Sequence, residues 1–252
     1  MDVNNVALVT GVGRSQGIGA AIALALAEQG SDVAVTWWAP YDERVHAATD
    51  HSFIDDVVRE IEAMGRRCVA LEADLANVIT PALLFDFVRD QLGMVSSLIL
   101  SHCESVDGGI VDTTIESFDR HFAVNARASW LLMKEFATRF NGPFGTGRIV
   151  SLTSDHVVGN LAYGASKGAL DRITVAAARE FAELGITANV INPGPTDTGW
   201  MDEELRVNVA HRTPLRRLAS PTDCARLVAF LCSDRGVWIN GQILHSDGGI
   251  NS

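Results

Sequence analysis

The sequence predicts an α/β fold in which helices cover both faces of a parallel sheet. Short apolar runs of four to seven residues alternate with helical stretches of ten or more, a pattern typical of βαβ units. The first run leads directly into a glycine-rich turn and then a helix, as in dinucleotide-binding folds. The 252-residue chain is 47% hydrophobic and 20% charged. We therefore expect one domain over residues 1–252 with a full hydrophobic core.

The expected elements alternate from one end of the chain to the other. The strands are residues 6–10, 32–37, 68–71, 97–101, 147–152, 186–192 and 242–245. The helices are residues 17–29, 51–64, 81–92, 117–140, 162–184 and 222–232. Two polar, irregular stretches, 39–50 and 193–213, are expected to be loops. Within the second, residues 195–212 would form a lid on the substrate side.

Composition excludes several classes of function. The chain has 20 basic and 31 acidic residues, a net charge of −11, which argues against a nucleic-acid partner or a polybasic membrane contact. The four cysteines, Cys68, Cys103, Cys224 and Cys232, form no CxxC pair, so we expect no metal site. No apolar run approaches the length of a membrane span and no signal peptide is visible. A cytoplasmic location is the expectation.

The turn after the first strand carries four glycines in nine residues. Glycines there permit a tight turn and a close approach of the backbone to a pyrophosphate, while the following helix offers free N–H groups. A tight βα turn without a ligand is the alternative. The residues expected at the cofactor are Gly11, Gly13, Arg14, Gly17, Ile18 and Gly19.

The end of the second strand bears on the type of cofactor. An acidic residue there would bind the ribose 2′-hydroxyl of NAD and repel the 2′-phosphate of NADP. This chain has no acidic residue there until Asp42. Arg14 in the glycine loop would pair with a 2′-phosphate, which favours NADP(H) over NAD(H); the alternative is that Arg14 is a solvated loop residue.

Tyr163 and Lys167 lie four positions apart on a predicted helix and therefore share a face. An ammonium beside a tyrosine favours the phenolate and lowers the pKa of the phenol, which turns it into a usable acid–base group. Ser154, after the fifth strand, would donate a hydrogen bond to a substrate carbonyl oxygen. A serine capping a turn is its alternative reading.

These motifs together resemble the short-chain dehydrogenase/reductase family over nearly the whole chain, with bacterial 3-oxoacyl-carrier-protein reductases most similar. The resemblance rests on the glycine loop, Ser154 and the Tyr163–Lys167 helix, and on further motifs around Asp74-Leu75, Asn125, 147–150, 192–198 and 247–249.

The resemblance implies a Rossmann-type doubly wound sheet of seven strands in the order 3-2-1-4-5-6-7. It implies that Tyr163 is the general acid and also contacts the cofactor, that Lys167 lowers its pKa and binds the cofactor ribose, and that Ser154 holds the carbonyl oxygen. Asn125 would support a proton-relay water. The remaining cofactor contacts it implies are Asp74 and Leu75 at the adenine and Pro193, Gly194, Thr196 and Thr198 toward the nicotinamide.

Three features depart from the family pattern. Residues 12–16 lengthen the glycine loop, and Ser154 lies only nine positions before Tyr163 instead of about thirteen. Ser101-His102-Cys103-Glu104 replaces the usual Asn-Asn-Ala-Gly. We expect His102 to be structural rather than an acid–base group, and Cys103 to be a small buried residue rather than a nucleophile.

The function predicted from these features is interconversion of a small-molecule carbonyl and a secondary alcohol by NAD(P)-dependent hydride transfer. One alternative is an enoyl-thioester reductase, whose tyrosine and lysine would be seven apart, but residue 160 is Asn. A non-catalytic dinucleotide-binding regulator is the other. The helices at 117–140 and 162–184 would build the interface of a homotetramer or homodimer.

Overall fold

The computed structural model describes residues 5–45 and 52–251. Its centre is a parallel sheet of seven strands in the order β3-β2-β1-β4-β5-β6-β7, which confirms the predicted Rossmann-type fold. The strands are β1 (Val6–Thr10), β2 (Asp32–Trp37), β3 (Cys68–Glu72), β4 (Ser97–Leu100), β5 (Arg148–Leu152), β6 (Thr187–Asn192) and β7 (Ile243–His245).

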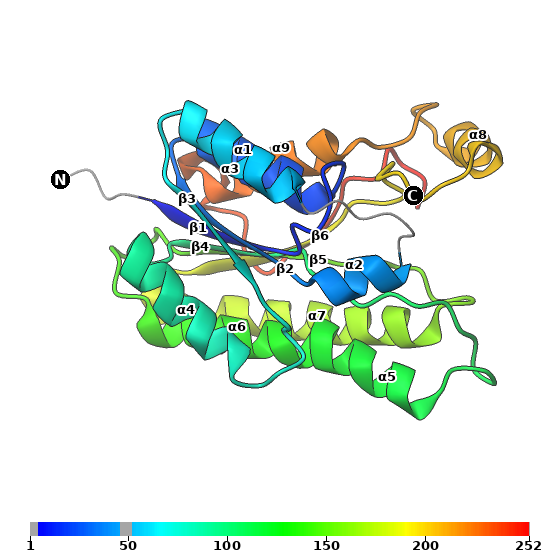
Figure 1. Cartoon of the computed structure of the whole chain (residues 1–252), viewed down its shortest axis with the longest axis horizontal. Coiled ribbons are helices and arrows are strands. Elements are labelled where there is room, and N and C mark those ends of the chain that lie inside the picture. The colour runs from blue at the N-terminus through cyan, green and yellow to red at the C-terminus, as the bar shows by residue number, and fades with distance from the viewer. Residues whose placement is uncertain (1–4, 46–51, 252) are drawn as a thin grey trace.

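Helices cover both faces of this sheet (Figure 1). One face carries α1 (Ile18–Glu28), α3 (Phe53–Ala63) and α9 (Pro221–Cys232), and the other α4 (Thr80–Gln91), α6 (Ser129–Arg139) and α7 (Leu161–Glu180).

Two hydrophobic cores result, one on each side of the sheet. Successive side chains of a strand point to opposite faces, so Val6 and Leu8 belong to one core, and Ala7 and Val9 to the other. Every residue of β1 is buried, because a parallel sheet covered on both faces leaves no side of its central strands in water.

Both stretches predicted as loops contain helices. Residues 39–45 form α2 (Ala39–Val45), while positions 46–50 of that stretch lie outside the described residues. In the second stretch α8 (Glu203–Arg212) has Asp202 as its N-cap, and the Asp202 side chain accepts a hydrogen bond from Leu205 N at 2.8 Å. Neither helix has the apolar periodicity that identified the other helices. The N-cap of α8 and the charged residues at its two ends favour that helix. Tertiary contacts hold α2 in place.

The single helix predicted at 117–140 is three segments. The α-helix α5 (Ile115–His121) passes into a π-helical segment, Phe122–Ala128, and then into α6. Wide turns of this kind occur frequently at functional sites. The helix predicted at 51–64 is observed as α3 from Phe53, and residue 51 lies outside the described range.

The turn between β1 and α1 depends on Gly11. Its N–H and that of Val12 both donate to the Thr36 carbonyl at 2.9 Å, which ties the glycine loop to the end of β2. Gly11 has φ of +77°, and a Cβ there would lie 2.6 Å from the backbone of His102. Only glycine fits this conformation and this contact.

We predict that Gly11→Ala lowers the free energy of unfolding by at least about 2 kcal/mol, because it combines a left-handed conformation with a backbone clash. Gly168→Ala is the matched control: Gly168 lies in α7, and a Cβ added there would meet no atom within 4 Å, so we expect it to stabilise the helix by up to about 1 kcal/mol. Urea unfolding measures both. Equal effects of the two substitutions would contradict the role of Gly11.

Candidate active site

A cleft of about 1010 Å³ opens at the carboxyl edge of the sheet. Loops that follow β1 to β6 line it, as expected for an open α/β sheet whose ligand binds beyond the carboxyl ends of the strands. Of the predicted site residues, all but Asn125 lie in its wall. These are Gly11, Gly13, Arg14, Gly17, Ile18, Gly19, Asp74, Leu75, Ser154, Tyr163, Lys167, Pro193, Gly194, Thr196 and Thr198.

The glycine loop ends at the N-terminus of α1. Gly17 is the N-cap and supplies no side-chain hydrogen bond, so the first N–H groups of the helix are available to an anion. A Cβ on Gly19 would lie 2.6 Å from the Gly11 carbonyl oxygen, which explains the requirement for glycine there. This part of the cleft fits a dinucleotide pyrophosphate.

The lengthened part of the loop reaches toward the segment after β6. Gly17 N donates to the Arg14 carbonyl at 3.0 Å and closes a turn. From this turn the Arg14 guanidinium donates to the Thr198 carbonyl at 3.4 Å. This hydrogen bond links the glycine loop to the segment after β6, while the charge of Arg14 also acts on Tyr41 of α2, just beyond β2.

Tyr163 and Lys167 share one face of α7, as their spacing predicts. The Lys167 ammonium is buried; it donates to the Leu152 carbonyl at 2.8 Å and lies 5.7 Å from the centre of the Tyr163 ring. The Ser154 hydroxyl accepts from His156 N at 3.1 Å and lies close enough to Tyr163 to lower the pKa of the phenol. The shorter spacing therefore keeps Ser154 at the tyrosine.

Burial dominates the electrostatics of this pair. It raises the pKa of Tyr163, aided by Cys103 and opposed by the Ser154 hydrogen bond. It lowers the pKa of Lys167, against the effect of Cys103 and Asp171. Lys167 Nζ is held at the Leu152 carbonyl and lies over the Tyr163 ring; that this cation lowers the pKa of the tyrosine stays a prediction.

The short segment 155–160 is fixed at both ends. Asn160, buried, donates to Ser105 at 3.2 Å and to Asp107 at 3.1 Å. A Cβ on Gly164 would lie 2.4 Å from the His156 carbonyl oxygen, so Gly164 lets this segment pack directly on α7. The residue seven positions before Lys167 therefore has a structural role.

Asn125 lies in the π-helical segment and its side chain is fully occupied. Its Oδ1 accepts from Glu104 N at 2.7 Å, and its Nδ2 donates to the Glu104 carbonyl and to Ser166 Oγ, both at 2.9 Å. Ser166 Oγ in turn donates to the Tyr163 carbonyl at 2.8 Å. Asn125 thus supports the site from behind its wall.

His102 and Cys103 differ in their surroundings. His102 is buried, with Nδ1 2.7 Å from Thr10 Oγ1 and Nε2 3.1 Å from the Val124 carbonyl oxygen. Burial, aided by Lys167, lowers the pKa of His102 to about 3, so the ring is a structural group. Cys103 is only half-buried, and its Sγ lies 3.9 Å from the Tyr41 hydroxyl.

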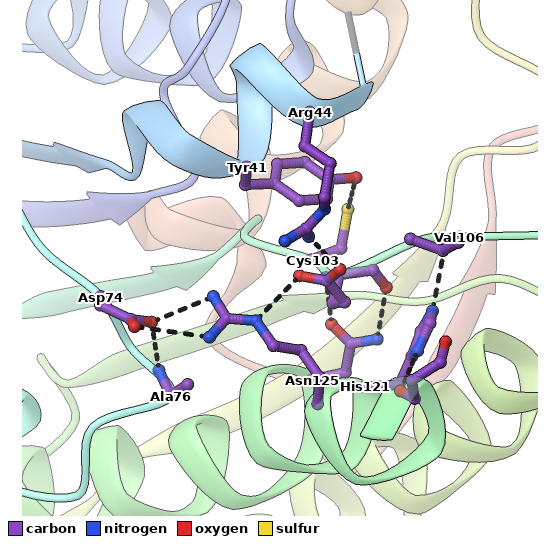
Figure 2. Close-up of polar contacts among 11 residues, drawn as sticks. Tyr41, Arg44, Asp74, Ala76, Cys103, Val106, His121 and Asn125 are labelled. Carbon is purple, nitrogen blue, oxygen red and sulfur yellow. Dashed lines mark hydrogen bonds and ion pairs between the residues drawn. The ribbon is translucent and has the colours of Figure 1, made fainter. Parts of the chain in front are cut away.

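A charged cluster lies in the wall of the cleft, and the sequence pattern did not predict it (Figure 2). Arg44 of α2 forms an ion pair with Glu104, and Arg120 of α5 lies 3.4 Å from the same carboxylate and 3.3 Å from Asp74. Asp74 also caps Ala76 N at 2.9 Å. The one available signal was Glu104 itself, a charged residue at a position where the resembled family has glycine.

Within residues 5–45 and 52–251, no helix is long and apolar enough to cross a membrane. The same residues contain no group of three or more His, Cys, Asp or Glu side chains that could hold a metal ion.

Comparison with known proteins agrees with this geometry. A family model described as "Enoyl-(Acyl carrier protein) reductase" matches residues 11–251. An uncharacterized oxidoreductase of Bacillus subtilis, YjdA, is 39% identical over 97% of this chain and 96% of its own. An NADPH-dependent aldehyde reductase-like protein of Arabidopsis thaliana is 34% identical over 97% and 93%.

A solved structure is similar over the full length of both chains. It is a blue fluorescent protein from a metagenomic library in complex with NADPH, with a TM-score of 0.86 and 32% identity over 100% of each chain. The family match, the sheet order and the relatives together establish a nicotinamide-dinucleotide oxidoreductase fold. The chain belongs to the short-chain dehydrogenase/reductase family.

Proposed function

We propose that this protein interconverts a small-molecule carbonyl compound and a secondary alcohol, with Tyr163 as the general acid–base residue. The observation that carries the proposal is that Ser154, Tyr163 and Lys167 lie together in the cleft wall, with the Ser154 hydroxyl acting on the phenol and the buried Lys167 ammonium over its ring. Two hydroxyl groups at one point can both donate to a single carbonyl oxygen.

The glycine loop and the α1 N-terminus would hold the cofactor pyrophosphate, with Asp74 and Leu75 toward the adenine. Lys167 would hold the nicotinamide ribose, and Pro193, Gly194, Thr196 and Thr198 would lie toward the nicotinamide. When bound, the cofactor supplies or accepts the hydride.

Residues of this chain would stabilise the negative charge that develops on the substrate oxygen during hydride transfer. Ser154 would hold the substrate oxygen as negative charge develops on it, and Tyr163 would give its hydroxyl proton to that oxygen. The Lys167 ammonium would then stabilise the phenolate that remains. Asn125 would support a proton-relay water near Lys167 from behind the cleft wall, through its hydrogen bonds to Glu104 and Ser166.

We predict that Tyr163→Phe lowers the turnover number by at least about 100-fold, because the proton donor is lost, while the dissociation constant for the cofactor stays unchanged. Ser154→Ala should lower turnover by roughly 100-fold, with the cofactor again bound normally. Steady-state rates and tryptophan-fluorescence titration measure the two quantities. Undiminished carbonyl reduction by Tyr163→Phe would exclude the mechanism.

The raised pKa of Tyr163 sets a second expectation. A phenol whose pKa lies above its ordinary value stays protonated through neutral pH, so the rate of carbonyl reduction should remain flat between roughly pH 6 and 8. Alcohol oxidation needs the phenolate, so its rate should rise with pH. A reduction rate that falls steeply across this interval would argue against Tyr163 as the acid.

We further propose NADP(H) as the preferred cofactor, with Arg14 as a partner of the 2′-phosphate. The NADPH complex of a 32%-identical neighbour and the NADPH-dependent relative favour this choice. Arg14→Gln should weaken NADPH binding roughly 10-fold, because a charge-assisted hydrogen bond is lost, and leave NADH binding unchanged.

The matched control for that titration is Arg59→Gln, since Arg59 lies on the exposed side of α3. It should change neither affinity. If Arg14→Gln weakens the binding of NADPH and NADH equally, Arg14 stabilises the glycine loop and does not bind the 2′-phosphate.

An enoyl-thioester reductase is the second candidate, favoured by the description of the matching family model. Assay of an enoyl thioester beside a ketone separates the two functions. Asn160 disfavours this candidate, because it stands seven positions before Lys167 and is engaged with Ser105 and Asp107. A protein that binds a dinucleotide but converts neither the ketone nor the enoyl thioester would instead fit the non-catalytic dinucleotide-binding regulator.

Assembly and lid closure are part of the same proposal. The exposed Trp130, beside Phe122 and Ile173, lines a hollow on the face formed by the α5–α6 segment and α7, which supports a homodimer or homotetramer built on these helices.

In residues 195–212, Met201 and Val209 are buried against the cleft while Trp200 is half exposed. This arrangement supports a role for residues 195–212 as a lid that closes over the substrate side of the cleft.

A further inference from the structure

The helix α2 spans the crevice in which a dinucleotide would lie. The sheet order reverses between β1 and β4, and in open α/β sheets the ligand crevice lies at such a reversal. The Asp42 carboxylate lies against the glycine loop after β1, since a Cβ on Gly13 would be 2.2 Å from Asp42 Oδ2. Tyr41 and Arg44 reach the residues after β4, at Cys103 and Glu104. Figure 2 shows Tyr41 and Arg44 over this segment.

Glu104 is a fixed point for that contact. Its backbone N–H and carbonyl are both held by the Asn125 side chain, at 2.7 and 2.9 Å, so the direction of its side chain is set by the π-helical segment. The side chain is 4% exposed, whereas that of Arg44 is 47% exposed. The anchor is therefore buried and its partner lies at the edge of the cleft.

A second cation near Glu104, Arg120, allows the Arg44–Glu104 ion pair to open and close. A buried carboxylate that loses its only partner is strongly destabilised. Glu104 keeps Arg120, 3.4 Å away, when Arg44 leaves. Arg120 is itself held by Asp74 at 3.3 Å. The Arg44–Glu104 pair can thus open without leaving a buried charge alone.

We propose that Glu104 is a positioning residue for cofactor binding, which holds Arg44 and keeps α2 closed across the crevice between β1 and β4. Entry of the dinucleotide then requires the Arg44–Glu104 pair to open. This inference rests on the proposed function, because it presumes that a dinucleotide occupies the cleft. It assigns to Glu104 and Arg44 a control of cofactor affinity that is separate from the chemistry at Tyr163.

The test is the affinity and entry rate of NADH and NADPH in Glu104→Gln and Arg44→Gln. A protein whose competent state is only partly populated binds with an affinity reduced by that fraction. The Arg44–Glu104 pair is an ion pair of ordinary strength. Its removal should therefore lower the dissociation constants for both cofactors about fivefold. The limiting rate of entry in stopped-flow fluorescence should rise by a similar factor, and the double variant should gain no more than either single variant.

The gain in affinity is the decisive sign, since structural damage would weaken binding. Arg44→Gln keeps the test valid if Glu104→Gln folds poorly, because Arg44 is half exposed at the surface. Glu135→Gln is the matched control: it removes a Glu–Arg pair to Arg139 at 2.8 Å on α6, away from the cleft, and should leave both constants unchanged.

The outcomes separate the two proposals. If the wild-type protein binds a dinucleotide and both variants bind it with unchanged constants, the inference about Glu104 is overturned and the proposed function stands. Weaker binding of NADH and NADPH by Arg44→Gln also overturns it, because Arg44 would then be a direct ligand. If the wild-type protein binds neither dinucleotide, the proposed function and this inference fail together.

Discussion

The parallel sheet brings the carboxyl ends of its strands to one edge, and every group of the candidate site depends on this arrangement. The central strands β1, β4, β5 and β6 are buried along their whole length, so the site is built from the loops that follow the strands. The Thr36 carbonyl shows how tightly one loop is held, since it accepts from both Gly11 and Val12 at 2.9 Å. The glycine loop is thereby placed beside the residues that follow β4, and the cleft is the space between these loops.

Asn125 joins the two halves of the cleft. A buried amide must satisfy its hydrogen-bonding groups, and this one does so with Glu104 on one side and Ser166 on the other. Ser166 continues to the Tyr163 backbone. The wall that carries the charged cluster and the helix that carries the tyrosine therefore form one hydrogen-bonded unit. Its centre lies in a π-helical segment, where the wide turn accommodates these contacts.

Burial sets the character of the acid–base pair. Removing a phenol from water disfavours the phenolate, and removing an ammonium from water disfavours the charged amine. Both effects act at Tyr163 and Lys167. The Leu152 carbonyl accepts the lysine hydrogen bond at 2.8 Å and offsets part of the cost of burying its charge. The tyrosine is thus kept as a proton donor, with a cation at its ring face that can stabilise the phenolate when the proton leaves.

The sequence by itself determined the sheet, most of its helices, the glycine loop and the Tyr163–Lys167 face, because hydrophobic periodicity, glycine placement and the Tyr163–Lys167 spacing are local properties of the chain. Tertiary structure alone decided three other features. The helix α2 lacks apolar periodicity and is held by distant contacts. The direction of Arg14 depends on Thr198, 184 positions away. The Arg44–Glu104 pair joins residues 60 positions apart. Ion pairs and hydrogen bonds of this kind form only after the sheet has brought its loops together, so no local pattern in the sequence encodes them.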